Sequence, residues 1–534
     1  MLHAVLFDGL VFSKISLKER ITMSIVNVTN LTHIYGDRMI FQDAGFRLLK
    51  GEHAGLVGAN GAGKSTFLRL LTGSLLPDYG NIEWQPNIRA GFLEQHAKLT
   101  EGTTILQYME KAYERLFEIE MEMNVLAEKM ADPGDNLEAM LKRYGELQTE
   151  LDASGFYQIG ANIEDAAQGL GLTEIGLDQD VTALSGGQRT KLLLAKLLLE
   201  EPDVLLLDEP TNYLDASHIE WLTGYLKNYE HAFLVISHDE RFLNEITTVT
   251  FHLEHQTIKR YSGNYQYFLK EYAQSRAQAE AAYAKQNREI KKLEAFIDRN
   301  RVRKAKQAKS REKALSKIKR IEKPTDSHVP RFEFTTGRNP AMTVLETEKL
   351  EAGYTVPLFK PLSLTVNRGD KIAIIGENGA GKSTLIKTLL GDLKPLSGIV
   401  TAGQHLQAAY FRQESPASHD TPLEKVRALF PDVPEKDIRQ TLAMSGLTPK
   451  HISQPFSTLS GGEQAKVRLA ELMLSNSNLL VLDEPTNHLD TLAKNALKQA
   501  LCDYKGTILL VSHEPAFYED WVTHVWRIEA WRRK

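Results

Sequence analysis

GANGAGKS at residues 58–65 and GENGAGKS at residues 376–383 decide the fold of this chain, because both match the pattern G-x-x-x-x-G-K-[ST]. Each match follows a short apolar run, residues 53–57 or 372–375, and precedes a helical pattern. In this strand–loop–helix context, a P-loop surrounds phosphate groups with backbone N–H groups at a helix N-terminus. The sequence therefore predicts two α/β P-loop ATPase domains in tandem.

Matching landmarks recur at fixed spacings, which indicates an internal duplication. Lys64 and Lys382 lie 318 residues apart, whereas the later Ser185 and Ser460 lie 275 apart, so the first copy holds 43 extra residues. In that interval, apolar residues recur at helical spacing on both sides of the turn sequence Asp132-Pro133-Gly134. We therefore expect an antiparallel helical hairpin, an arm, inserted into the first copy at about residues 100–158.

These landmarks divide the chain into four predicted parts, of which the nucleotide-binding domains are the largest. The parts are an N-terminal extension at 1–22, a first nucleotide-binding domain with its arm at 23–270, a helical linker at 271–330, and a second nucleotide-binding domain at 340–534. The extension is interpreted as an artefact of an upstream start, and the true first residue, Met1 or Met23, stays open.

Composition limits the class of protein. Charged residues make up 25% and hydrophobic residues 42% of the 534 residues, as in ordinary soluble domains. No apolar run approaches the roughly 18 residues that cross a bilayer. The single cysteine, Cys502, precludes an internal disulfide and favours a reducing compartment. We therefore expect a cytoplasmic protein.

Adjacent carboxylates follow a buried apolar run in each copy, at Asp208-Glu209 and at Asp483-Glu484. The first carboxylate of each pair is predicted to orient Mg²⁺, and the second to polarise the attacking water. Lysine and serine at the end of each P-loop are predicted to bind the β/γ-phosphates and the metal, respectively. The residues expected to surround ATP are Gly58, Ala59, Asn60, Gly61, Ala62, Gly63, Lys64, Ser65 and Thr66, and Gly376, Glu377, Asn378, Gly379, Ala380, Gly381, Lys382, Ser383 and Thr384.

The segments LSGGQ at 184–188 and LSGGE at 459–463 resemble the signature motif of ATP-binding-cassette (ABC) ATPases. This resemblance implies that Gln95 and Gln413 add to the metal ligands Ser65, Asp208, Ser383 and Asp483. It also implies that the switch histidines His238 and His513 act with Glu209 and Glu484 in catalysis, and that Tyr35 and Tyr354 stack on adenine. Each ATP is then expected to lie between one P-loop and the opposite signature, formed by Ser185, Gly186 and Gly187 or by Ser460, Gly461 and Gly462. Tyr213, at the position of His488 in the second copy, leaves the equivalence of the two sites open.

The linker has the opposite charge to the rest of the chain. Residues 281–323 contain 16 Lys/Arg and 5 Asp/Glu, a net charge of +11, whereas the whole chain carries −5. A charge run is often only a solvated face, but such a one-sided sign on an acidic protein favours polyanion binding through phosphate contacts. The residues predicted to bind RNA are Arg299, Arg301, Arg303, Lys304, Lys306, Lys309 and Arg311.

Two nucleotide-binding domains on one chain, an arm and a basic helical linker together resemble the ABC-F proteins, from about Met23 to the C-terminus. The segments YSGNY at 261–265 and QAKSR at 307–311 resemble that family too. The resemblance implies an ATPase that binds the ribosome near the tRNA exit site when its domains close on ATP, with contacts to the large subunit, ribosomal RNA and tRNA. It implies a monomer with intramolecular pairing of the domains and no stable membrane partner.

Four alternatives stay open at this point. One is a factor that protects ribosomes from antibiotics, which the short linker disfavours. Another is the ATP-binding subunit of a membrane transporter with separate membrane chains, which explains neither the linker nor the arm. A DNA-handling ATPase and a non-catalytic scaffold are the remaining two. The paired carboxylates argue against the scaffold.

Overall fold

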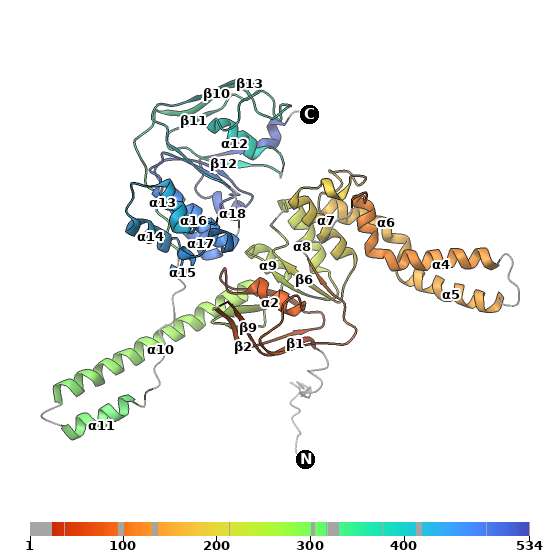
Figure 1. Ribbon diagram of the computed structural model, residues 1–534, viewed down its shortest axis with the longest axis horizontal. Helices are drawn as coiled ribbons and strands as arrows, with labels where there is room; N and C mark the ends of the chain where they lie inside the picture. Colours follow the sequence, from red (N-terminus) through yellow and green to blue (C-terminus); the bar gives the residue numbers. More distant parts are fainter. Residues whose placement is uncertain are drawn as a thin grey trace, which may run out of the picture. The chain divides into compact units, whose positions relative to one another are not determined.

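The computed structural model forms two compact units, a first unit at Met1–Tyr265 and a second unit at Gln266–Lys534 (Figure 1). The residues that the structure describes are 24–36, 38–93, 101–130, 137–212, 214–300, 305–316, 318, 330–377, 379–412, 419–487 and 489–532.

The main sheet of the first unit has six strands in the order β5-β6-β7-β3-β8-β9. Its strands are β3 (His53–Val57), β5 (Ala90–Phe92), β6 (Val204–Asp208), β7 (Ala232–Ile236), β8 (Val249–Glu254) and β9 (Thr257–Tyr261). All pairs are parallel except β8 with β9. The central strands are almost wholly buried, as continuous apolar runs in a parallel sheet should be.

A smaller antiparallel sheet of the first unit holds the P-loop helix in place. Its strands, in the order β2-β1-β4, are β1 (Ser24–Tyr35), β2 (Arg38–Leu49) and β4 (Tyr79–Trp84). Phe67 of helix α2 (Lys64–Leu71) lies 5.7 Å from the ring of Phe41 and 4.9 Å from that of Phe46, and the latter contacts Phe251 of the main sheet. This aromatic cluster fixes the start of α2 between the two sheets.

The remaining helices of the first unit include the predicted arm. They are α3 (Ile105–Glu110), α4 (Glu114–Met130), α5 (Leu137–Ala153), α6 (Ile159–Gly169), α7 (Gly186–Leu199), α8 (Ala216–Lys227) and α9 (Glu240–Ile246). Helices α4 and α5 pack side by side and project from the unit as a hairpin (Figure 1). The predicted turn at 132–134 lies outside the described residues.

The arm buries its apolar residues only near its base. Ile119, Met123, Leu147 and Leu151 form a separate small core. Leu141, which the helical spacing places on the same stripe, is 55% exposed. Two helices alone cannot enclose such residues, so apolar spacing predicts the hairpin correctly but overestimates its burial.

The second unit repeats the architecture of the first unit without an arm. Its main sheet, in the order β14-β15-β16-β12-β17, consists of β12 (Lys371–Ile375), β14 (Ala408–Phe411), β15 (Leu479–Asp483), β16 (Thr507–Val511) and β17 (His524–Arg527). Its smaller sheet, in the order β11-β10-β13, consists of β10 (Thr343–Glu351), β11 (Thr365–Asn367) and β13 (Ser397–Ala402). After the linker, its helices are α12 (Lys382–Leu390), α13 (Pro422–Leu429), α14 (Glu435–Met444), α15 (Pro449–Ser453), α16 (Gly461–Leu474), α17 (Thr491–Asp503) and α18 (Pro515–Tyr518).

The linker is helical, as predicted. It consists of α10 (Tyr265–Asn300) and α11 (Ala305–Ser316). The Arg311 guanidinium of α11 stacks 3.7 Å from the ring centroid of Phe296 in α10, which joins the two helices. In the part of the chain that the structure describes, no helix is long and apolar enough to span a membrane.

The arm core supports a prediction about local stability. Leu147→Ala should lower the free energy of unfolding of the hairpin by about 2–5 kcal/mol, because Leu147 is fully enclosed in a core of few residues. The loss falls on the hairpin alone, so hydrogen exchange of α4 and α5 amides should quicken while β6 and β7 stay protected.

Leu141→Ala is the matched control, because it removes the same atoms from an exposed position of the same helix and should change exchange little. Equal acceleration by both substitutions, or acceleration throughout the first unit, would contradict a separate arm core.

Candidate functional site

Both P-loops end in a buried lysine at the start of a helix. Lys64 Nζ donates to the carbonyls of Gly58 and Ala59, at 2.8 and 3.3 Å, so the loop wraps around the ammonium group. Gly63 caps the helix with φ at 110°, and a Cβ there would lie 2.3 Å from Cγ2 of Ile40. Only glycine satisfies both constraints at that position.

The second P-loop repeats this geometry and brings in a switch histidine. Lys382 Nζ donates to Gly376 O at 2.5 Å and to Glu377 O at 3.2 Å. It also lies 2.6 Å from His513 Nε2. The lysine is 8% exposed, so it is a buried cation whose partners are loop carbonyls and an imidazole.

Each P-loop serine meets the first carboxylate of its acidic pair. Ser383 Oγ donates to Asp483 Oδ2 at 2.8 Å, and Ser65 makes the equivalent hydrogen bond with Asp208. Burial raises the pKa of Asp208, while the bond from Ser65 and the charge of Lys64 act in the opposite direction. A hydroxyl beside a buried carboxylate is the oxygen donor set that Mg²⁺ prefers.

The second carboxylate of each pair sits on a left-handed turn that the sequence analysis did not foresee. Glu209 has φ at 50° and Glu484 has φ at 49°, a region that non-glycine residues rarely occupy. Each backbone N–H nevertheless bonds to the next strand, at Ile236 O or Val511 O. The turn therefore ends the strand and redirects the glutamate toward the switch histidine, as strained residues at functional sites often do.

Glutamate and histidine lie together in both units. His238 Nε2 is 3.4 Å from Glu209 Oε1, and His513 Nε2 is 3.1 Å from Glu484 Oε1. The second contact is an ion-pair distance without hydrogen-bond alignment, and Glu484 Oε1 is buried with no hydrogen-bond partner among the described residues. Burial raises the pKa of Glu484 to about 7, against the opposing charge of Lys382.

Tyr410 is a site residue that the sequence analysis missed. Its hydroxyl donates to Asp483 Oδ2 at 3.2 Å from strand β14, and burial raises its pKa. The same position in the first unit is Phe92, 318 residues earlier, which has no hydroxyl. Aligning the two copies along their full length, rather than at motifs alone, would reveal this difference.

The signature segments begin helices through the same capping arrangement. Ser185 caps α7 and Ser460 caps α16, each in a capping box with the residue three positions later. The glycines Gly186 and Gly461 follow as the first helical residues, which leaves backbone N–H groups at the helix start available to an anion.

The other predicted site residues are only partly described. Tyr35 and Tyr354 are 70% and 64% exposed, so their rings are available for stacking. Arg299, Lys309 and Arg311 are exposed on the linker helices. The residues whose placement or side chain lies outside the described part are Gln95, Tyr213, Arg301, Arg303, Lys304, Lys306, Asn378, Gln413 and His488.

The described residues of the second unit fit ATP with Mg²⁺. Lys382 is a buried cation that a phosphate would satisfy, Ser383 and Asp483 would hold the metal, and the orphaned oxygen of Glu484 would accept a hydrogen bond from water. The first unit places Lys64, Ser65, Asp208, Glu209 and His238 in the same relation. When bound, Mg²⁺ would neutralise phosphate charge.

The raised pKa of Glu484 gives a prediction for the nucleotide-free protein. Between pH 4.5 and about 7 the unfolded glutamate ionises while the folded one stays protonated, so stability falls as pH rises through this window. Glu484→Gln removes that dependence. At pH 8 the free energy of unfolding of the variant should exceed that of the wild type by about 3 kcal/mol. At pH 4 the two free energies should agree.

Hydrogen exchange of β15 and β16 amides measures this difference in the second unit. Glu346→Gln, at an exposed position of β10, is the control and should show no pH-dependent gain. A gain that is the same at both pH values would contradict a raised pKa at Glu484.

Comparison with known families agrees with this geometry. A family model described as "ABC transporter" matches residues 41–212 and 359–487, and a second model with that description matches residues 251–334. The matched residues include both P-loops, both acidic pairs and the whole linker.

Two curated relatives span nearly the whole chain. "Uncharacterized ABC transporter ATP-binding protein YfmM" of Bacillus subtilis is 51% identical over 96% of this chain and 100% of its own. "ABC transporter F family member 2" of Arabidopsis thaliana is 35% identical over 94% of this chain and 76% of its own.

Among solved structures, the fold is similar to that of "RNase-L Inhibitor", with a TM-score of 0.56 and 19% identity over 93% of this chain and 87% of that one. Another, "Model of ribosome-bound archaeal Pelota and ABCE1", has a TM-score of 0.55 and 20% identity over 92% of this chain and 75% of that one. At such identity the likeness shows the tandem fold alone.

Proposed function

Because this chain belongs to the ABC-F family and is an ABC-type ATPase, we propose that it binds the ribosome in its ATP-bound state and acts there on translation. ATP hydrolysis then releases it. The basic helical linker, on a chain with two P-loop ATPase domains, is the observation that supports this proposal. A ribosomal partner implies the cytoplasm as its compartment.

We infer the following roles at each ATP site. Lys382 binds the phosphates, Ser383 and Asp483 hold Mg²⁺, and Glu484 takes a proton from the attacking water while His513 orients it. The pKa of about 7 suits Glu484 to that task, because a general base is most effective when its pKa lies near the pH at which it works. Lys64, Ser65, Asp208, Glu209 and His238 take the same roles in the first unit.

We further propose that each ATP bridges the P-loop of one unit and the signature segment of the other. The free N–H groups at the starts of α7 and α16 suit a phosphate. Such a bridge has partners on both units only while the γ-phosphate is present, so hydrolysis would release one from the other. The chain would then work as a monomer.

The linker is proposed as the RNA-binding surface. Exposed Arg299, Lys309 and Arg311 belong to a segment with a net charge of +11, on a chain of net −5. Such a surface favours phosphate contacts over base reading. The short interval between α10 and α11, residues 301–304, supports a general translation factor over an antibiotic-protection factor, because the resemblance associates protection with a lengthened linker tip.

The catalytic assignment predicts the behaviour of the double variant Glu209→Gln/Glu484→Gln. It should bind ATP normally but hydrolyse it at least about a hundredfold more slowly, because each site loses its general base. Phosphate release and equilibrium binding of a fluorescent ATP analogue measure the two properties.

Glu346→Gln/Glu348→Gln is the matched control, since both glutamates are exposed on β10 and outside the site. Hydrolysis by the catalytic variant at the wild-type rate would show that these glutamates are not the bases.

The linker assignment predicts a change in salt dependence. Replacing Arg301, Arg303, Lys304 and Lys306 by glutamine should weaken binding to purified ribosomes, because each side chain removed is a cation that would neutralise a phosphate. The log–log salt slope should fall by roughly one unit for every phosphate that these side chains would otherwise neutralise. Filter binding over a series of salt concentrations gives that slope. An unchanged slope would exclude these four residues from the RNA-binding surface.

A further inference from the structure

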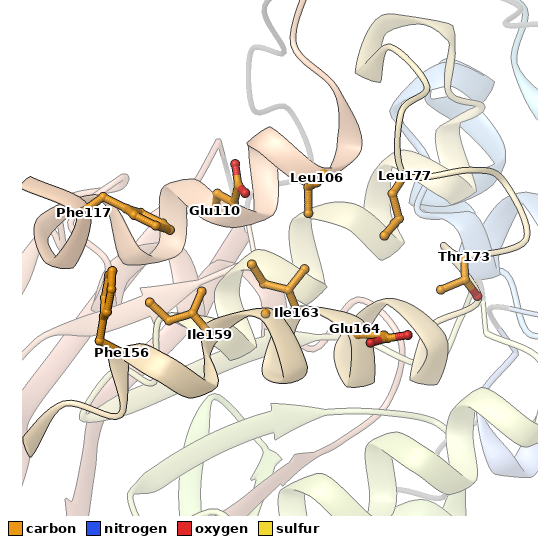
Figure 2. A pocket seen from close by; sticks show the side chains of 10 residues that line it. Leu106, Glu110, Phe117, Phe156, Ile159, Ile163, Glu164, Thr173 and Leu177 are labelled. Atoms are coloured by element: carbon orange, nitrogen blue, oxygen red, sulfur yellow. The ribbon is translucent and has the colours of Figure 1, made fainter. Parts of the chain in front are cut away.

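A groove of about 420 Å³ lies at the root of the arm in the first unit, away from the residues assigned to ATP (Figure 2). Its apolar side chains come from α3, the start of α4, the segment leading into α6, α6 itself and the segment after α6. They are Leu106, Phe117, Phe156, Ile159, Ile163 and Leu177. This volume lies within the range of small-molecule sites, and a mostly apolar lining with a few polar groups is common in them.

One residue that lines the groove is a glycine, which places no side chain there. Gly160 lines it from the first turn of α6, and a Cβ at that position would meet no atom within 4 Å. In Figure 2, Leu106 and Ile163 lie on facing segments, with their side chains directed toward one another. The groove therefore has room for an incoming side chain.

Two carboxylates border the groove, Glu110 from α3 and Glu164 from α6 (Figure 2). No lysine, arginine or histidine is among the lining residues. Within the described part of the chain, neither carboxylate has a hydrogen bond or an ion pair. The groove thus combines an apolar floor with negative charge that this unit does not neutralise there.

The second unit shows how the same position looks when its charges are paired internally. Thr104 and Thr421 form equivalent capping boxes on α3 and α13, so Glu110 corresponds to Arg427, six residues after the cap. The spacing of 275 relates α6 to α14, with Gly171 and Gly446 in left-handed conformation just after each helix.

By that spacing, Gly160 corresponds to Glu435 and Glu164 to Arg439. In the second unit Arg427 Nη1 donates to Glu435 Oε2 at 3.3 Å, and Arg439 Nε donates to Glu435 Oε1 at 2.9 Å. In the second unit, therefore, the carboxylate of Glu435 lies between the guanidinium groups of Arg427 and Arg439. The first unit has the opposite charges at both flanking positions and an open glycine in place of the central group.

We propose that the groove of the first unit binds a basic, amphipathic segment of a partner protein. Lysine or arginine side chains of that segment meet Glu110 and Glu164, as Glu435 meets its two arginines in the second unit. An apolar neighbour fills the space above Gly160 and contacts Leu106 and Ile163. Charge disfavours RNA in this groove, because phosphates would face two carboxylates.

A short fluorescein-labelled peptide of alternating arginine and leucine, titrated against the full-length protein, tests this site by fluorescence anisotropy. Saturable binding is expected, and Glu110→Arg/Glu164→Arg should weaken it roughly tenfold, the loss expected from two exposed ion pairs. The same variant should gain affinity for the matching peptide of alternating glutamate and leucine. Gly160→Phe should abolish binding of both peptides to either background, because the ring fills the groove without changing net charge.

Glu118→Arg/Glu138→Arg is the matched control, because it makes the same charge change at exposed positions of the arm outside the groove. Retained ATP hydrolysis shows that each variant is folded. If the charge-reversed variant does not fold, Gly160→Phe alone tests whether the peptide binds in the groove. Equal weakening by the control variant, unaltered binding to Gly160→Phe, or no saturable binding to the wild type would each overturn the proposal.

Discussion

The ATP site of the second unit depends on a lysine and a glutamate that are buried together at the carboxyl ends of parallel strands. Lys382 and Glu484 are each 8% exposed, beside the continuous apolar strand β15. Burying such groups is costly, and they stay charged only if nearby partners offset the loss of water. Lys382 has the loop carbonyls and His513 as partners. One oxygen of Glu484 has no hydrogen bond among the described residues, and burial raises the pKa of this glutamate to about 7. The site is thus built around groups that a phosphate and a water molecule would complete.

The rest of each unit holds these groups in position. The strand residues before each acidic pair are buried on both faces, so the acidic pair can lie only at the strand end. The left-handed turn at Glu209 and Glu484 then redirects the second carboxylate toward the histidine of the next strand. In the first unit, Phe67 packs against Phe41 and Phe46, and this contact holds helix α2 and the P-loop before it in position.

Much of this arrangement follows from sequence, since the P-loops and acidic pairs each have one local geometry that performs their chemistry. The predicted α/β fold, the arm and the helical linker are confirmed. The left-handed glutamates are not visible in a pattern of residue types, because glutamate has no intrinsic preference for that conformation. Leu141 is exposed for a different reason: helical spacing defines a stripe, and only tertiary neighbours decide whether the stripe is covered. Comparison of the two copies could have found Tyr410 and the charge reversal at Glu110 and Glu164. The roles of individual site residues and the linker's partner stay predictions.

The ATP dependence of ribosome association tests the proposed function most directly. The Glu209→Gln/Glu484→Gln protein should be sedimented with purified ribosomes through sucrose gradients containing either ATP or ADP. Migration with the ribosomes in ATP, and at the top of the gradient in ADP, is the predicted result. Migration that is the same with both nucleotides would contradict a ribosome-binding ATPase controlled by its nucleotide.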